Sequence, residues 1–196
     1  MDWHLYHAVY SVSLHHRWVG SFFNGIETAS IPGMVVATVG LWVFARPGGG
    51  RKWKLASGSA LAAATLALLV NRGVAAIWHR ARPYQTHAIA HPWTSSRDAS
   101  FPSDHASASF AIAFAVLMFD RLVGSLFLVA AALIGVGRVF IGAHYPGDVA
   151  AGVVVGFACA IAVVKLARPL IALLVRLVER VTDPLLRPLW RFARPS

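Results

Sequence analysis

Residues 101–105 (FPSDH) and 138–148 (RVFIGAHYPGD) each lie at an end of a long apolar run. The first stretch precedes the apolar residues 106–119, and the second separates the apolar residues 122–137 from 149–164. Ionisable groups at the edge of hydrocarbon are costly to desolvate and usually mark a working site. The two stretches therefore predict membrane-crossing helices that hold histidine, arginine and carboxylate groups at the rim of the membrane.

The composition of the chain is typical of a polytopic membrane protein. Of its 196 residues, 57% are hydrophobic and only 13% are charged, whereas a soluble domain carries about a quarter charged residues. The single cysteine, Cys159, lies inside an apolar run, so an intrachain disulfide is excluded and a packing role is expected. The first 16 residues lack the basic region and apolar core of a cleavable signal peptide, so none is expected there.

Five apolar segments predict an all-α membrane helical bundle with five core spans in a single domain, 1–196. They cover residues 28–44, 55–78, 106–119, 122–137 and 149–164. Within a catalytic core at 28–168, polar helix ends are expected to be buried in protein rather than lipid.

Amphipathic interfacial helices are expected at both ends of this core. The aromatic-rich segment 1–27 contains one at 2–23, and the basic segment 169–196 contains the other at 169–190. A sixth span at 169–190 stays open as the alternative, although three charged residues interrupt its centre.

The net charge of +10 does not indicate a nucleic-acid partner, because the basic residues flank apolar runs. Basic residues in that position predict the orientation of the protein in the membrane. With five spans, one side receives Arg46, Arg51, Lys52, Lys54, Arg121, Lys165, Arg168, Arg176, Arg180, Arg187, Arg191 and Arg194. That side is expected to be cytoplasmic and to include the C-terminus. The loops 80–105 and 138–148 then face the periplasm or exterior of a multi-pass protein of the plasma (inner) membrane.

The residue types in these motifs are those that can attack a phosphate and stabilise its charge. Pro146 is suited to the first turn of a helix, so His144 and Asp148 are expected about one turn apart, with the carboxylate fixing the imidazole tautomer for nucleophilic attack. Ser100 and Ser103 are candidate caps of a helix whose N-terminus binds an anion, and His105 is a candidate general acid. The guanidinium groups of Arg82 and Arg138 are expected to hold phosphoryl oxygens.

These residues and their spacing resemble the type 2 phosphatidic acid phosphatase superfamily, whose signatures are K-x6-R-P, P-S-G-H and S-R-x5-H-x3-D. The resemblance covers roughly residues 55–164, in the same order. Three positions depart from the pattern: Ala75 takes the place of the lysine, Asp104 the place of the glycine, and Gly137 the place of the serine.

The resemblance implies a role for each residue and requires no metal or cofactor. His144 attacks phosphorus to form a phosphohistidine, Asp148 orients it, and His105 protonates the leaving oxygen and then activates water. Arg82, Arg138 and Ser103 bind the phosphoryl oxygens. Two further residues are expected at the phosphate. Arg80 is the preferred substitute for the lysine, with Arg72 as the alternative, and Asp104 is expected to pair with Arg80 or Arg97.

The FPSDH form, the five-span layout and the Arg-x-Arg-Pro ending of the second span resemble undecaprenyl pyrophosphate phosphatases of the bacitracin-resistance type. That resemblance implies hydrolysis of the terminal phosphate of a polyprenyl diphosphate, recycling the carrier lipid of cell-wall (peptidoglycan) synthesis. The alternative is a broader phosphatase acting on phosphatidic acid, phosphatidylglycerol phosphate or other isoprenoid diphosphates. The tail length and the oligomeric state stay open.

Two other classes of function fit the sequence less well. A transporter is expected to show a pair of Gly- or Pro-broken helices around a midplane site, and this pattern is absent from the sequence. A metal site built from His87, His91, His105 and His144 lacks a tight ligand spacing and leaves the arginines unexplained.

Overall fold

The computed structural model describes residues 2–44, 50–89 and 93–192, and these residues form helices and connecting loops without a strand. The elements in order are α1 (Asp2–His15), α2 (Arg17–Val43), α3 (Arg51–Ile77), α4 (Pro83–Thr86), α5 (Asp104–Leu117), α6 (Arg121–Phe140), α7 (Pro146–Ile161), the π-helical turn η1 (Ala162–Leu166) and α8 (Arg168–Phe192). The predicted all-α class is confirmed.

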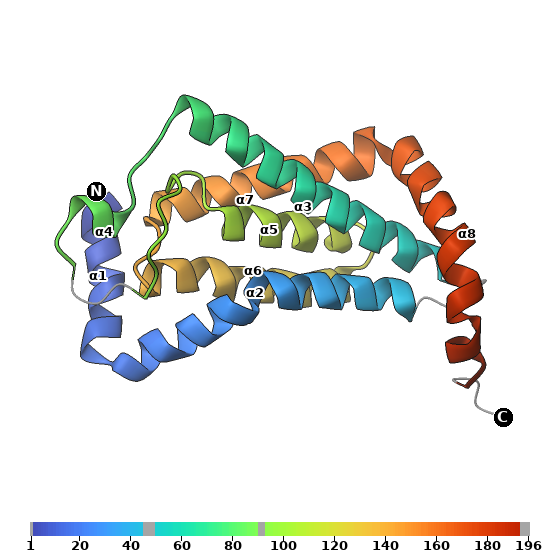
Figure 1. Cartoon of the computed structure of the whole chain (residues 1–196), viewed down its shortest axis with the longest axis horizontal. Helices are drawn as coiled ribbons and strands as arrows, with labels where there is room; N and C mark the ends of the chain where they lie inside the picture. The colour runs from blue at the N-terminus through green and yellow to red at the C-terminus, as the bar shows by residue number, and fades with distance from the viewer. Residues whose placement is uncertain (1, 45–49, 90–92, 193–196) are drawn as a thin grey trace.

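The five predicted apolar segments form the long axis of the bundle (Figure 1). Helices α2, α3, α6 and the continuous α7–η1 unit are long and apolar enough to cross a membrane. Helix α5 has 14 residues and is about 21 Å long, which is short of the ~30 Å of hydrocarbon. It packs against α3, α6 and α7 in the centre of the bundle, so its ends meet protein rather than lipid.

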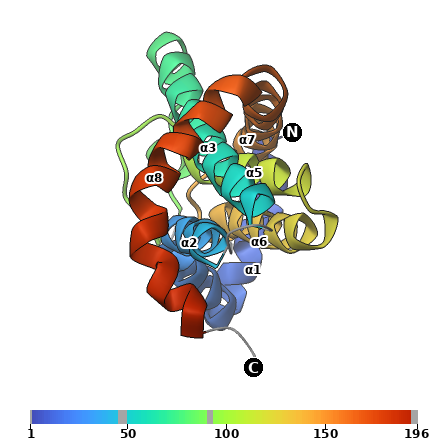
Figure 2. The same cartoon turned by 90° about the vertical axis from the view of Figure 1, so that its right-hand side faces the viewer.

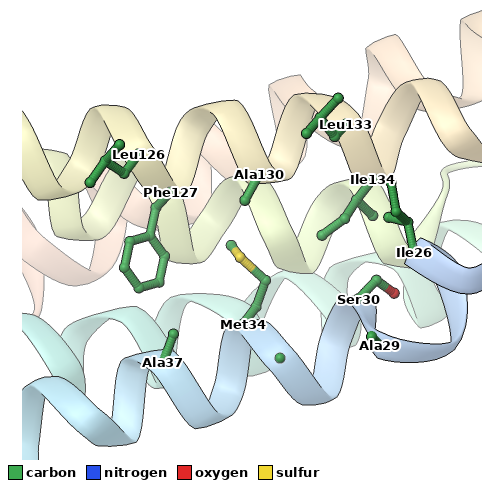
Figure 3. Close-up of a pocket in the computed structure, with 11 residues that line it drawn as sticks. Ile26, Ala29, Ser30, Met34, Ala37, Leu126, Phe127, Ala130, Leu133 and Ile134 are labelled. Atoms are coloured by element: carbon green, nitrogen blue, oxygen red, sulfur yellow. The ribbon is translucent and has the colours of Figure 1, made fainter. Parts of the chain in front are cut away.

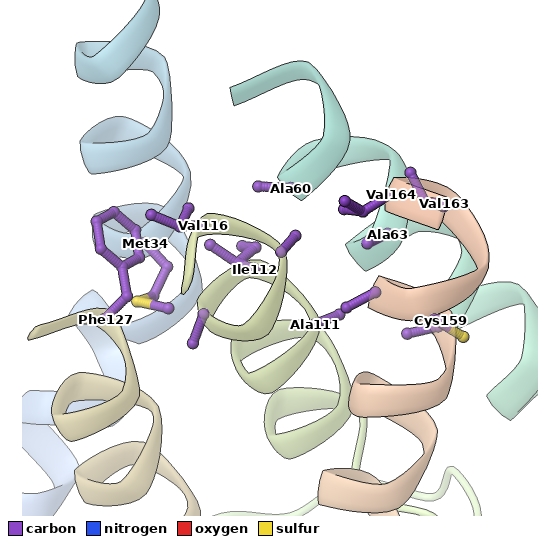
Figure 4. Close-up of a cluster of buried hydrophobic side chains, with 14 of the residues drawn as sticks. Met34, Ala60, Ala63, Ala111, Ile112, Val116, Phe127, Cys159, Val163 and Val164 are labelled. Carbon is purple, nitrogen blue, oxygen red and sulfur yellow. The ribbon is translucent and has the colours of Figure 1, made fainter. Parts of the chain in front are cut away.

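Small residues let the central helices approach closely (Figure 4). A Cβ atom at Gly152 would lie 2.7 Å from the Cβ of Ala106, and one at Gly156 would lie 2.8 Å from the backbone oxygen of Ser107. Cys159 is a buried free cysteine in the same core, as expected for a packing residue. The contact of α7 with α5 sets the two motif-bearing helix N-termini side by side.

The single N-terminal helix predicted at 2–23 is not formed, and the first long helix begins before the predicted span at 28–44. Helix α1 ends at His15 and α2 begins at Arg17, so residues 17–27 belong to the first long helix. Glu27 is the acidic residue in this stretch, and its carboxylate pairs with Arg138 of α6. Helix α1 lies across one end of the bundle (Figure 1) and buries Tyr6 and Tyr10 against α6 and α7.

Helix α8 lies across the opposite end of the bundle rather than beside the spans (Figure 2). Lys54 of α3 is 2% exposed, and its Nζ lies 2.6 Å from Asp183 and 3.6 Å from Glu179 of α8. The Nε1 of Trp190 also donates to the Val43 carbonyl at 2.8 Å. This placement matches an in-plane helix, and α8 lacks the hydropathy of a span.

Candidate active site

Three separated segments of the chain are joined by backbone hydrogen bonds at the α1 end of the bundle. The Ser100 amide donates to the Arg80 carbonyl at 2.7 Å, and the Ser103 amide donates to the Asp148 carbonyl at 3.1 Å. Arg82 is extended, as the residue before a proline prefers, and Pro83 begins α4. The three motif regions of the sequence therefore meet in one place.

His144 is buried in this place, 2% exposed, in the loop between α6 and α7. Its Nδ1 lies 2.8 Å from the Ser100 carbonyl oxygen. Because a carbonyl only accepts, Nδ1 carries the proton and the lone pair of the ring is on Nε2. That Nε2 lies 3.3 Å from Nη1 of Arg82. The ring is thus held with its nucleophilic nitrogen beside a guanidinium group.

Asp148 is fully buried on the first turn of α7 and has three hydrogen-bond donors. Its Oδ2 accepts from the Ser100 hydroxyl at 2.5 Å and from the Tyr145 amide at 3.0 Å, and its Oδ1 accepts from Arg80 at 2.6 Å. Its distance to Nδ1 of His144 is 3.7 Å, which is longer than a hydrogen bond. Asp148 therefore supports His144 mainly through Ser100.

Arg80 connects the site to α1. Its Nη1 binds Asp148 and its Nη2 binds Asp2 at 2.7 Å, while its Cζ lies 4.1 Å from the centre of the Tyr145 ring. Asp2 also accepts from the Gly147 amide at 3.0 Å. Both terminal nitrogens of Arg80 are thus engaged by carboxylates, an arrangement that does not favour its expected role as a phosphate ligand.

The two other arginines and the second histidine are close to His144. The Nε of Arg82 donates to the Asp98 carbonyl at 3.0 Å, and its Nη1 donates to the Ala143 carbonyl at 3.3 Å. Arg138 is buried at the end of α6, and its charge, like that of Arg82, acts on both His105 and His144. Within the described part of the chain, the His105 ring makes no hydrogen bond.

Ser103 and Asp104 begin α5. The Ser103 hydroxyl caps the helix by accepting from the Ala106 amide, as predicted. The expected arginine partner of Asp104 is a wrong prediction: its carboxylate accepts from Asn71 of α3 at 2.7 Å, and no described arginine pairs with it. The reason is that Asn71 and Asp104 face each other across the α3–α5 contact.

A cavity of about 330 Å³ lies beside Asp104. Ala75, at the position of the family lysine, lines it together with Arg72, His79 and Arg97. Arg72 and Arg97 are therefore the arginines that share this cavity with Ala75, whereas Arg80 is bound to Asp148 and Asp2.

Burial sets the electrostatics of the nucleophile. It lowers the pKa of His144 from about 6.5 to about 4, while Asp148 opposes this shift and the charges of Arg138 and Arg82 reinforce it. The imidazole is therefore neutral at neutral pH, which is the form that can attack an electrophile.

Some residues that bind the catalytic side chains were not predicted from the sequence to belong to the site. Ser100 was expected only as a helix cap, and Asp2, Glu27 and Tyr145 were assigned no role. Glu27 carried a usable signal, because it directly precedes the apolar segment 28–44 and a charge at the edge of hydrocarbon needs a partner. Ser100 carried none, since its bonds depend on how two loops meet.

The alternative metal site is not formed by the described residues. No group of three or more His, Cys, Asp or Glu side chains lies close enough among them to hold a metal ion, and His91 lies outside the described residues. His87 instead stacks on Trp3, with ring centres 3.6 Å apart.

The fold and the site define a membrane helical bundle with two histidines, two arginines and a buried aspartate gathered at one end. Residues 56–171, more than half of the chain, match the model of the PAP2 superfamily. The chain belongs to this superfamily and is a multi-pass membrane phosphatase of it.

Individual relatives agree with this assignment. The chain is 28% identical over 188 residues to "Undecaprenyl-diphosphatase BcrC" of Bacillus subtilis, covering 94% of this chain and 95% of that protein. It is 35% identical over 124 residues to "Decaprenylphosphoryl-5-phosphoribose phosphatase" of Mycobacterium tuberculosis, covering 63% and 64%. The crystal structure of Aquifex aeolicus LpxE has the same fold, with a TM-score of 0.70, 22% identity, and coverage of 83% of this chain and 93% of that one.

Proposed function

We propose that the protein removes the terminal phosphate of undecaprenyl diphosphate, or a related polyprenyl diphosphate, through a phosphohistidine intermediate. The observation that carries this proposal is the orientation of His144, with Nδ1–H bound to Ser100 and Nε2 beside Arg82. Two relatives whose names specify polyprenyl substrates support the choice of lipid.

In the first step, Nε2 of His144 attacks phosphorus while the bond from phosphorus to the bridging oxygen breaks. His105 donates its proton to that leaving oxygen, and the lipid monophosphate departs. The positive charge that forms on the His144 ring is stabilised by the Ser100 carbonyl and by the nearby Asp148 carboxylate. In the second step, His105 takes a proton from water, the water oxygen bonds to phosphorus, and inorganic phosphate leaves His144.

The charge on the transferring phosphoryl group is stabilised by groups that are already in place. Arg82, Arg138 and the amides at the start of α5 surround it, so the contact of Arg82 with His144 is replaced by contacts with phosphoryl oxygens. Ser103 orders the start of α5. Arg80 acts through Asp148, and Asp104 holds the α3–α5 contact through Asn71.

The active site is proposed to face the periplasm or exterior of the plasma membrane, with the C-terminus in the cytoplasm. The described basic residues Lys52, Lys54, Arg121 and Arg168 lie at or next to the α8 end of the bundle, opposite the site (Figure 1). Loops rich in Lys and Arg are found on the cytoplasmic side of membrane proteins, so the end of the bundle with the site is expected to face outward. A carrier lipid left on the outer face after glycan transfer would be hydrolysed there. Arg46 and Arg194, also used for the predicted orientation, lie outside the described residues.

The test is phosphate release by the purified protein in detergent, comparing undecaprenyl diphosphate, phosphatidic acid and phosphatidylglycerol phosphate. We expect the highest kcat/KM for the polyprenyl substrate, no activity of His144→Ala on any substrate, and unchanged turnover in EDTA. His105→Ala should lower turnover of all three substrates, because it removes both the acid of the first step and the base of the second. Equal kcat/KM for all three lipids would favour the broader phosphatase, and activity of His144→Ala would exclude this mechanism.

A further inference from the structure

An apolar groove of about 420 Å³ lies between α2 and α6 (Figure 3). Its walls are aliphatic and aromatic side chains, with Ser30 as the polar exception, and the Ser30 hydroxyl is already bound to the Glu27 carbonyl at 2.7 Å. The groove therefore offers no free polar group along its length and suits a hydrocarbon chain.

The groove runs along the bundle for the depth of one membrane leaflet. On α2 it extends from Ile26 to Ala37, and on α6 from Ile134 to Leu126. At 1.5 Å per residue, the α2 wall is about 16 Å long, or about half of the ~30 Å hydrocarbon thickness. A lipid chain whose headgroup is at the membrane rim has this reach.

One end of the groove lies next to the ion pair of Glu27 and Arg138. Ile26 is followed in the chain by Glu27, and Ile134 lies one helical turn before Arg138. Oε1 of Glu27 pairs with Nη1 of Arg138, whereas Oε2 of Glu27 and Nε of Arg138 are buried without a partner among the described residues. In the part of the chain that the structure describes, Arg138 therefore has a free donor, Nε, while the Glu27 carboxylate binds its Nη1.

A second apolar cavity, of about 380 Å³, does not share this position. It lies between α2, α3 and α8, with Trp42 and Val178 in its wall, at the end of the bundle opposite His144. Proximity to Arg138 of the active site thus distinguishes the α2–α6 groove.

We propose that the α2–α6 groove holds the hydrocarbon chain of the lipid substrate, and that Glu27 is the carboxylate that the substrate's phosphate displaces from Arg138. This inference rests on the proposed function. In the empty site, Glu27 neutralises a buried guanidinium group that would be costly to leave unpaired. The Glu27 side chain is 22% exposed, so it can turn toward the rim when a phosphate with more charge and more acceptor oxygens arrives.

Glu27→Gln tests the competition for Arg138. The amide keeps the size of the side chain but removes its charge, so we expect inhibition by inorganic phosphate to tighten about fivefold and the KM for undecaprenyl diphosphate to fall. Thr28→Val, an exposed neighbour on α2, should change neither value. Weaker phosphate inhibition in Glu27→Gln would mean that Glu27 holds Arg138 in position, and would overturn the proposed displacement.

Gly33→Leu tests the groove. Gly33 lines it, and a Cβ atom there meets no heavy atom within 4 Å, so the leucine fills the groove without disturbing the fold. We expect the KM for undecaprenyl diphosphate to rise at least fivefold, while kcat/KM for water-soluble isopentenyl diphosphate is unchanged. Gly73→Leu on α3 is the matched control, because its Cβ also meets open space.

The outcomes separate this inference from the proposed function. If the wild type hydrolyses no lipid phosphate, the proposed function fails. If the wild type is active but Gly33→Leu retains the wild-type KM for the long lipid, the function stands and the groove proposal is wrong, with a bilayer lipid as the occupant of the groove.

Discussion

His144 is held by a carbonyl oxygen of Ser100 at 2.8 Å, while Asp148, one helical turn further along, lies 3.7 Å from the same ring nitrogen. The Ser100 hydroxyl closes this arrangement by donating to Asp148 at 2.5 Å. One serine thus fixes the tautomer of the histidine through its backbone and binds the aspartate through its side chain.

Ser100→Ala should lower kcat about tenfold with little change in KM. The alanine keeps the carbonyl that binds His144 but removes the hydroxyl bound to Asp148, a loss on the order of 1 kcal/mol. Ser100→Thr should restore most of the rate, because it keeps the hydroxyl. Steady-state kinetics in detergent micelles measure both values, and a wild-type kcat in Ser100→Ala would show that the serine side chain has no part in orienting the site.

Arg80→Met should destabilise the protein by about 3–5 kcal/mol, because it leaves the fully buried Asp148 carboxylate without its ion pair. Asp2→Asn should cost less than about 1 kcal/mol, since the Asp2 side chain is about a third exposed. Unfolding in detergent followed by circular dichroism measures both changes. If Arg80 instead binds the substrate's phosphate, Arg80→Met will raise KM and leave stability unchanged.

The stability of the protein should fall as the pH is lowered from about 6.5 to about 4. His144 has a pKa of about 4 in the folded protein and about 6.5 when unfolded, so the unfolded chain binds the additional proton in this interval. The stabilisation is fully present above pH 6.5, and at most about 3 kcal/mol of it is lost by pH 4.

Unfolding measured at several pH values checks this dependence, with His144→Gln as the comparison. The glutamine does not titrate, so the variant should lose less stability than the wild type over the same interval. Identical pH dependence of the two proteins would contradict a lowered pKa of His144.

Gly156→Ala should destabilise the bundle by about 1–3 kcal/mol and lower activity, because the new Cβ would lie 2.8 Å from backbone atoms of both Ser107 and Ala111 on α5. Helix α7 carries Asp148, so a shift of α7 also moves the site. Gly73→Ala, where the added Cβ meets open space, should be neutral or stabilising by up to about 1 kcal/mol. The midpoint of thermal unfolding and kcat should therefore both fall in Gly156→Ala, and neither should fall in Gly73→Ala.

The apolar segments and the motif spacing were sufficient to predict the helical bundle and the meeting of Arg82, His105 and His144. Hydrophobic length is a local property of the chain, and the offset from His144 to Asp148 is set by a single helical turn. The extent of α2 was not predictable in the same way, because the pairing of Glu27 with Arg138, which lowers the cost of a charge on an apolar helix, joins two distant segments.

The sequence by itself determined which residue types stand at the rim of the membrane and which helices carry them. Only the tertiary structure decided their partners: Arg80 with Asp148 and Asp2, Asp104 with Asn71, and Arg138 with Glu27. Each of these pairs joins segments far apart in the chain. Their choice depends on how the helices rotate and approach, which the small residues of α5 and α7 allow and which no spacing within one segment encodes.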